Sequence, residues 1–186
     1  MINRDQAEDL LKKYISNVKT LYHSYASEAV LRALAKYFDE DAEKWGLAGL
    51  LHDIDVEQTE GDPEKHALEA MDILKSEGIK DEDVLDAIRM HNEMATGEER
   101  KTRFQHALAA GETITGLIYA TALVYPDKKI APVKPKSITK RMKQKAFAAS
   151  VNRDTIRECE KAGISLEEFV PLALDAMKAI DTKIGL

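Results

Sequence analysis

The segment "LLHDIDVEQ", residues 50–58, ends an apolar run with a histidine and an aspartate side by side. His52 and Asp53 carry side chains of the types that bind divalent transition metals. At the end of a helix the backbone leaves the helical path, so two neighbouring side chains can converge on one ion. Asp53 has two carboxylate oxygens and could bridge two ions. The alternative is a helix end that simply reaches water.

Three further histidines and one glutamate share helical faces with apolar residues. His23, His66, His91 and Glu112 are spaced at steps of three and four from these residues, so each should point inward. The apolar neighbours on the four faces include Val30 and Leu34, Ile73 and Leu74, Val84 and Ile88, and Leu108 and Tyr119. A single inward histidine is more often a hydrogen-bonded core residue. An inward Glu112 needs a cation or strong donors, because burying an unpaired carboxylate is costly.

Imidazoles and carboxylates in one site favour Mn, Fe, Co, Ni or Zn, whereas Mg and Ca prefer oxygen ligands alone. We therefore predict a divalent transition-metal cofactor of one or two ions. The fifth histidine, His106, lies off the pattern, because six residues before Glu112 correspond to roughly 240° around a helix. His106 is expected to pack or to face solvent, and a supporting role around the site is the alternative.

The elements that must position these residues are all predicted to be helices. Capping signals and apolar periods indicate a single compact all-α domain of about eight or nine helices. The expected ranges are 3–15, 18–38, 40–52, 63–78, 81–92, 102–125, a helix from near 137, 152–163 and a last helix from 165. Residues 53–62 read as an acidic loop. Pro171 is expected to kink or interrupt the last helix.

Composition limits the classes of function. The chain has 186 residues and a formal net charge of −6, so no global feature indicates a nucleic-acid or membrane partner. Cys159 is the only cysteine, which fits a reducing compartment. No uncharged run reaches the roughly 18 residues that read as membrane-spanning. We expect a cytoplasmic protein that acts on a small molecule rather than on nucleic acid, and the oligomeric state stays open.

The order of these residues resembles the HD superfamily of metal-dependent phosphohydrolases. That pattern is a histidine, a His-Asp doublet about thirty residues later, one or two further histidines, and an aspartate on a later helix. The matching positions here are His23, His52-Asp53, His66, His91 and Glu112. The resemblance covers residues 18–125, so residues 126–186 would form a helical extension.

The resemblance implies an HD-domain-like fold and a metal-dependent phosphohydrolase. Its substrate would be a small phosphate ester, with nucleotides among the candidates. Metal ligands would be His23, His52, Asp53 and Glu112, with His66 and His91 serving a second ion. Asp53, His66 and His91 would be the catalytic residues. The alternatives are a di-iron oxygenase on the same scaffold and a non-catalytic module that binds a nucleotide or RNA.

Four positions depart from the family pattern. Glu112 stands where the family usually has Asp, and Asp55 where many members have Gly. The branch that cleaves cyclic dinucleotides carries Lys at the position of Val56, which argues against cyclic di-GMP as the substrate. Asn92 stands where a second histidine would follow His91.

Two charged segments lie outside the ligand pattern. Residues 128–145 contain eight basic residues and no acid, and Lys140 and Arg141 are predicted to contact the substrate phosphate. The alternative is a solvated basic loop. The acidic loop that includes Asp55, Glu57 and Glu60 is predicted to be solvated or to act as a lid.

Overall fold

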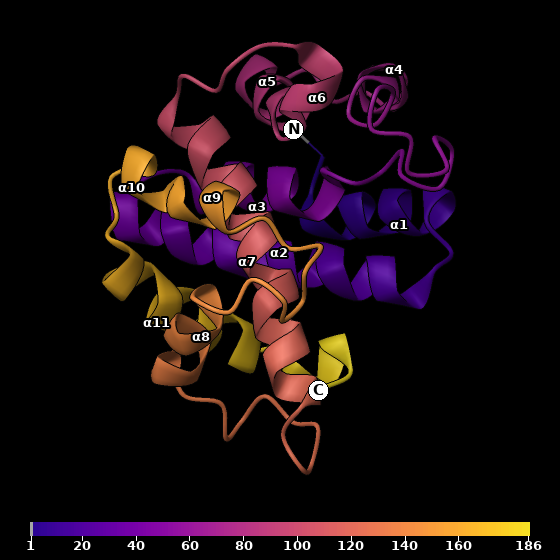
Figure 1. Cartoon of the computed structure of the whole chain (residues 1–186). Helices are drawn as coiled ribbons and strands as arrows, with labels where there is room; N and C mark the ends of the chain where they lie inside the picture. The colour runs from indigo at the N-terminus through magenta and orange to yellow at the C-terminus, as the bar shows by residue number, and fades with distance from the viewer. Residues whose placement is uncertain (1) are drawn as a thin grey trace.

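Two long helices, α2 (Val18–Phe38) and α7 (Arg103–Leu123), form the centre of the fold in the computed structural model (Figure 1). The structure describes residues 2–186. α3 (Ala42–Leu51) packs closely along α2, because Gly49 has no side chain: a Cβ there would lie 2.8 Å from the carbonyl oxygen of Ser27. This close approach holds the end of α3, where the His-Asp doublet lies, against α2.

The remaining helices are grouped around this centre. They are α1 (Arg4–Tyr14), α4 (Glu69–Ser76), α5 (Glu82–Met90), α6 (Glu93–Thr96), α8 (Pro135–Met142), α9 (Arg153–Arg157), α10 (Cys159–Ala162), α11 (Leu166–Lys178) and the 3-10 helix η1 (Asp181–Ile184). α4, α5 and α6 lie together at the top of Figure 1, and α8 and α11 lie toward the bottom. Residues 2–186 contain no strand, which confirms the predicted all-α class.

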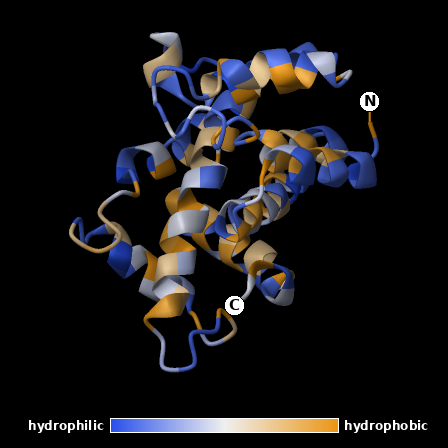
Figure 2. Cartoon of the chain, turned by 90° about the vertical axis from the view of Figure 1, so that its right-hand side faces the viewer, coloured by the Kyte–Doolittle hydropathy of each residue, from blue (hydrophilic) through white to orange (hydrophobic). Residues whose placement is uncertain are grey.

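Most helices carry both hydrophobic and hydrophilic residues, as the mixed colours of Figure 2 show. Leu31 on α2, Leu51 on α3, Ile88 on α5 and Leu108 on α7 are all fully buried. Burying one such side chain contributes roughly 1.5–3 kcal/mol of folding free energy. The helices that carry the predicted ligands are thus held together by their apolar faces.

The fourth helix was predicted to begin at Pro63, but α4 begins at Glu69, so His66 lies in the turns before the helix. The backbone of Ala67 has φ +76°, which an α-helix cannot accommodate. The Asp55 carboxylate accepts hydrogen bonds from the backbone N–H groups of Ala67 (2.8 Å) and Ala70 (2.9 Å). Asp55 therefore acts as the capping residue at the start of α4. Because Asp55 lies well before the helix in the sequence, a local capping pattern could not predict this role.

The C-terminal helices differ from expectation at two points. The segment predicted as one helix over 152–163 is divided at Glu158 into α9 and α10. Pro171 does not interrupt α11, which runs unbroken from Leu166 to Lys178. The carbonyl that loses its helical donor at Pro171 belongs to Glu167, an exposed residue, so water can replace that donor.

Candidate metal centre

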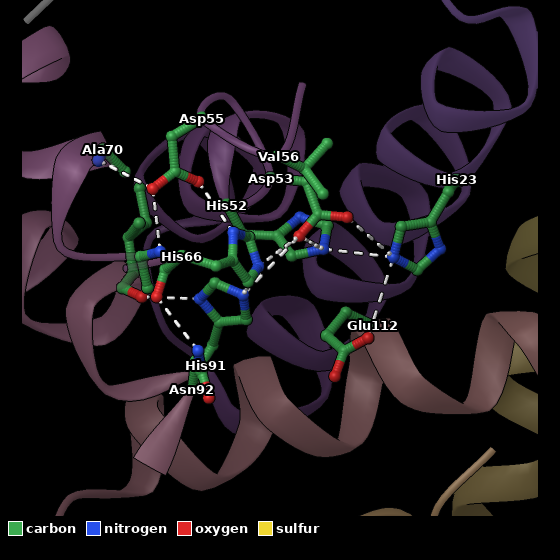
Figure 3. Close-up of polar contacts among 12 residues, drawn as sticks. His23, His52, Asp53, Asp55, Val56, His66, Ala70, His91, Asn92 and Glu112 are labelled. Atoms are coloured by element: carbon green, nitrogen blue, oxygen red, sulfur yellow. Dashed lines mark hydrogen bonds and ion pairs between the residues drawn. The ribbon is translucent and has the colours of Figure 1, made fainter. Parts of the chain in front are cut away.

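The His-Asp doublet lies at the C-terminal end of α3, where both side chains turn toward the same point (Figure 3). The His52 ring is completely buried, and its Nε2 lies 3.3 Å from Oδ1 of Asp53. The predicted convergence of two neighbouring side chains at a helix end is what the structure shows.

Six side chains form two adjacent groups that could each hold a metal ion. The first group is His23, His52 and Glu112, and the second is Asp53, His66 and His91. In the first group, Nε2 of His23 lies 3.1 Å from Nε2 of His52 and 3.7 Å from Oε2 of Glu112. In the second, Nε2 of His66 lies 3.0 Å from Nε2 of His91. The structure therefore brings together all six residues that the sequence singled out as ligands.

Asp53 lies between the two groups. Its Oδ1 is 3.2 Å from Nε2 of His66 and 3.5 Å from Nε2 of His91, while its Oδ2 is 3.5 Å from Nε2 of His23. One carboxylate thus faces both groups: Oδ1 lies near His66 and His91 and also 3.3 Å from Nε2 of His52, while Oδ2 lies near His23. This placement suits the bridging role expected of Asp53.

All four imidazole rings are held with Nε2 toward the centre. Nδ1 of His52 donates to the carbonyl of Gly49 at 2.9 Å, and Nδ1 of His91 donates to the carbonyl of Ile88 at 2.6 Å. Because these carbonyls only accept, the proton of each neutral ring is on Nδ1, and Nε2 keeps its lone pair for a metal.

The other two rings are fixed in the same tautomer by side chains. Nδ1 of His66 donates to Oδ1 of Asp55 at 2.7 Å. Nδ1 of His23 lies 2.9 Å from the Thr115 hydroxyl, which itself donates to the Glu112 carbonyl at 2.6 Å. The single hydroxyl proton of Thr115 is used in that bond, so the Thr115 oxygen accepts from His23.

This arrangement fits a metal on chemical grounds. With both Nδ1 atoms donating, the neutral rings of His23 and His52 have no proton left for their 3.1 Å Nε2···Nε2 contact. His66 and His91 face each other in the same way at 3.0 Å, and there the second proton of His66, whose pKa is raised to about 10, lies between the Nε2 atoms until a cation replaces it. Two facing lone pairs repel unless a proton or a cation lies between them. Nitrogen donors with carboxylate oxygens are a ligand set for Mn, Fe, Co, Ni or Zn.

The electrostatics of the buried groups agree with a cation site. Burial lowers the pKa of His52 to about 3, so its ring is neutral at physiological pH. Burial raises the pKa of Glu112 to about 8, so this carboxyl requires positive charge to ionise at neutral pH. Against the effect of burial, the neighbouring histidines, His52 foremost, hold the pKa of Asp53 well below its usual range. Burial would lower the pKa of His66, but the carboxylates of Asp53 and Asp55 raise it to about 10.

Asp55 was predicted to belong to a solvated acidic loop, and that prediction was wrong. Its side chain is fully buried and accepts from His66, Ala67 and Ala70. Glu57 in the same segment accepts from the backbone of Ser16 and Asn17, which ties the loop to the start of α2. The acid at position 55 is explained by its partner His66, eleven residues further along the chain. The composition of the loop did not indicate this contact.

A second buried network stabilises the position of His91. The Arg100 guanidinium donates to the carbonyls of Met90 (2.9 Å) and His91 (3.0 Å), and it forms a two-bond ion pair with Glu158. Nδ1 of His106 also donates to Glu158, at 2.7 Å. His106 is therefore buried in a supporting network, which was the alternative considered for it. The sequence carried no signal for Arg100, because its partner lies 58 residues away.

A cavity of about 420 Å³ opens onto the ligands His23, His91 and Glu112. The other residues that line it are Asn92, Glu93, Met94, Arg100, Thr113, Gly116, Ser150, Val151, Asn152 and Thr155. Its wall thus includes residues from the C-terminal segment 126–186. Most polar groups around it are neutral, and its lining gives a reacting molecule access to the candidate metal ligands.

Lys140 and Arg141, the predicted phosphate contacts, lie on α8 and do not line this cavity. The Arg141 guanidinium lies 4.1 Å from the centre of the Phe147 ring and donates to Gln144. The structure does not place them beside the metal ligands, and their phosphate contact stays a prediction.

Asn92, which stands in place of a second family histidine, has a structural role. Its amide donates to the carbonyls of Pro63 (2.8 Å) and His66 (2.9 Å), and its oxygen caps α6. Asn92 therefore supports the loop that carries His66 (Figure 3).

In the part of the chain that the structure describes, no helix combines the length and the apolar character that crossing a membrane requires.

Comparison with known proteins gives one match. The family model described as HD domain matches residues 20–124, which is more than half of the chain. The matched range includes all six candidate ligands. No curated protein and no solved structure matches the chain.

Proposed function

Because the chain belongs to the HD domain family of metal-dependent phosphohydrolases, we propose that it hydrolyses a small phosphate ester. One observation carries this proposal: four imidazole Nε2 atoms and two carboxylates converge beside a cavity, and every Nδ1 is already occupied as a donor. Nucleotides are among the candidate substrates.

Two divalent ions fit the donor set. One would be held by His23, His52 and Glu112, the other by His66 and His91, with Asp53 facing both. When bound, such ions supply Lewis acidity, which makes water a nucleophile near neutral pH and neutralises charge on phosphoryl oxygens. The identity of the metal among Mn, Fe, Co, Ni and Zn belongs to the proposal.

The residues of the chain have separate roles around the reacting phosphate. Asp53 and the four histidines present fixed lone pairs, so little reorganisation is needed before reaction. Asn152 lines the cavity, and its side-chain NH₂ group can donate hydrogen bonds to phosphoryl oxygens, whereas the Thr113 hydroxyl donates to Glu112. Asp55 keeps the Nδ1 proton on His66.

The test combines metal analysis with activity. Protein purified without added metal should contain one or two transition-metal ions per chain and should hydrolyse p-nitrophenyl phosphate or a nucleotide when Mn, Co or Ni is supplied. His52→Ala and Asp53→Ala should lose both metal and activity while keeping helical circular dichroism. Asp175→Asn, at an exposed position on α11, is the control and should behave as the unmodified protein.

The same measurements separate the alternatives. Two iron ions with turnover that requires oxygen would favour the di-iron oxygenase, which uses the same type of ligands. Absence of bound metal and of turnover across a panel of metals and esters would favour a non-catalytic binding module. Unchanged metal content in both ligand variants would refute the assignment of the site.

A further inference from the structure

A second cavity lies beside the first and differs from it in chemistry. Its volume is about 250 Å³, and most of its wall is apolar or aromatic. The residues that form this wall are Tyr22, Ala26, Tyr119, Ala120, Leu123 and Met177. No acidic residue lines it, and Lys19, its one lysine, is exposed. We refer to it as the apolar cavity and to the first as the metal cavity.

The two cavities meet at two residues. His23 and Gly116 line both of them, and Thr115, which holds the His23 ring, lines the apolar cavity. His23 is a candidate ligand, so the apolar cavity begins directly beside the position where a phosphate would be cleaved. A molecule bound at the metal ligands would therefore extend into the apolar cavity past His23 and Gly116.

Gly116 lies inside α7, where glycine is less stable than alanine. Packing favours glycine here, since a Cβ at Gly116 would lie 3.3 Å from the Cγ2 of Val151, and that one side chain would have to shift. Gly111 on the same helix differs, because a Cβ there would lie 2.6 Å from a Leu31 methyl. Glycine therefore leaves no side chain at a position where the two cavities share their lining.

The charges of the metal cavity argue against a second phosphate group. Arg100 is its only lysine or arginine, and all its N–H groups are directed to Met90, His91, Glu93 and Glu158. No donor of Arg100 is left for a substrate. Glu93 also lines the cavity, and its negative charge would repel a further anion.

We propose that the substrate is a phosphate monoester of an apolar, aromatic alcohol, with its phosphoryl group at the metal ligands and its ring in the apolar cavity. This inference rests on the proposed function and names its substrate class. In the reaction, the oxygen of water forms a bond to phosphorus as the bond from phosphorus to the alcohol oxygen breaks. A proton from water passes to that oxygen, and the products are the free alcohol and inorganic phosphate.

Binding of phosphonates tests the apolar cavity without any turnover, because their carbon–phosphorus bond is not hydrolysed. With saturating Mn²⁺, calorimetry should show that 1-naphthylphosphonate binds at least about tenfold tighter than methylphosphonate. In a series of alkylphosphonates, each added methylene should tighten binding about threefold to fourfold until the cavity is full. Equal affinity for the naphthyl and methyl compounds would overturn the inference.

Substitutions locate the effect. Ala120→Trp fills the apolar cavity, and Gly116→Leu closes the junction, so each should reduce the naphthyl-to-methyl affinity ratio to near one. Val124→Trp is the control, because Val124 is an exposed apolar residue directly after α7 and does not line the cavity. It should keep the original ratio.

Metal content and helical circular dichroism are measured for each variant. Leu123→Gln, a polar change at a residue that lines the cavity and is 44 % exposed, provides a milder test should the larger substitutions fail to fold. It should reduce the ratio about threefold. An unchanged ratio in every variant that folds and binds metal would contradict the inference.

The two proposals fail in different ways. Preferential binding of naphthylphosphonate without hydrolysis of any ester supports the apolar cavity and contradicts the proposed hydrolase. Efficient hydrolysis of esters with equal rates for methyl and naphthyl leaving groups supports the hydrolase and contradicts the apolar cavity as a substrate site.

Discussion

At the scale of single residues, the site depends on which nitrogen of each histidine ring carries the proton. His66 is the clearest case, because the acceptor that holds its Nδ1 proton is the buried carboxylate of Asp55. The same carboxylate accepts two backbone N–H groups through its other oxygen. One side chain thus orients a ligand and starts a helix.

Asp55→Asn should weaken binding of the second ion. An amide has one oxygen, and the two backbone N–H groups of Ala67 and Ala70 require it, so the NH₂ group would face Nδ1 of His66. That contact forces the proton to Nε2 and removes the lone pair. Loss of such a supporting partner typically costs about 10- to 100-fold in metal affinity. Metal titration by calorimetry measures the effect.

The control for this change is Glu60→Gln, which alters an exposed acid in the same loop. It should leave both affinity and stoichiometry unchanged. Wild-type affinity in Asp55→Asn would show that the tautomer of His66 does not control binding.

Glu112→Ala should reduce the affinity for the first ion by at least about tenfold, because it removes the anionic member of the group with His23 and His52. Glu112→Asp should cause an intermediate loss, since its carboxylate reaches less far from α7. Metal affinity is measured by competition with a chelator. Affinity improved by Asp would mean that glutamate is the poorer fit at this family position, and unchanged affinity in Glu112→Ala would show that Glu112 is not a ligand.

At the scale of elements, the site depends on contacts between segments distant in sequence. Arg100 precedes α7, yet it joins the C-terminal end of α5 to the break between α9 and α10. His91 caps α5 and is held through its own carbonyl by Arg100. Glu158 is thus the link through which the C-terminal segment supports a ligand of the metal centre.

Arg100→Lys should reduce the free energy of unfolding by about 2–3 kcal/mol. Lysine cannot reproduce the planar set of donors, and the Glu158 carboxylate would stay buried with a poorer partner. Urea unfolding of the metal-free protein measures the loss. Arg89→Lys on α5 is the control, because the ion pair of Arg89 with Glu98 is exposed and should contribute less than about 1 kcal/mol. Equal effects of the two changes would contradict a special role for Arg100.

At the scale of the whole molecule, both ends of the chain meet at one carboxylate. Glu8 on α1 accepts from Arg4, from Lys12 at 2.7 Å, from the Tyr25 hydroxyl at 3.0 Å and from Lys183 at 3.1 Å. Lys183 belongs to η1, so this cluster connects the last turn of the chain to α1 and α2. Burial opposes ionisation of Glu8, but hydrogen bonds from Lys12, Arg4 and Lys183 lower its pKa.

Glu8→Gln should reduce stability by about 1–2 kcal/mol at neutral pH, after allowance for solvent screening. A carboxyl with a lowered folded-state pKa contributes stability above its ordinary pKa of 4.5, and the contribution is lost as the pH falls toward the folded-state value. The stability difference between the wild type and Glu8→Gln should therefore shrink below about pH 4.5.

Urea unfolding between pH 7 and pH 3 measures this difference. Asp9→Asn changes an exposed acid on the same helix and should show no comparable dependence. A difference between wild type and Glu8→Gln that stays constant over this range would mean that the cluster does not depend on the charge of Glu8.

The sequence by itself determined the all-α class, most helix boundaries and all six candidate ligands. Helical periodicity and capping residues are local signals, and the residue types that bind transition metals are few, so His23, His52, Asp53 and Glu112 could be recognised one by one. Boundaries were missed where a distant side chain intervenes, as Asp55 does at the start of α4.

Only the tertiary structure decided how these residues cooperate. The two ligand groups around Asp53, the Asp55–His66 contact and the Arg100–Glu158 pair join residues that lie between 11 and 89 positions apart. The two cavities on either side of His23 and Gly116 likewise form from segments that meet only on folding. Such contacts depend on the packing of whole helices, and a local pattern of residues contains no information about which distant side chain will fill a given space.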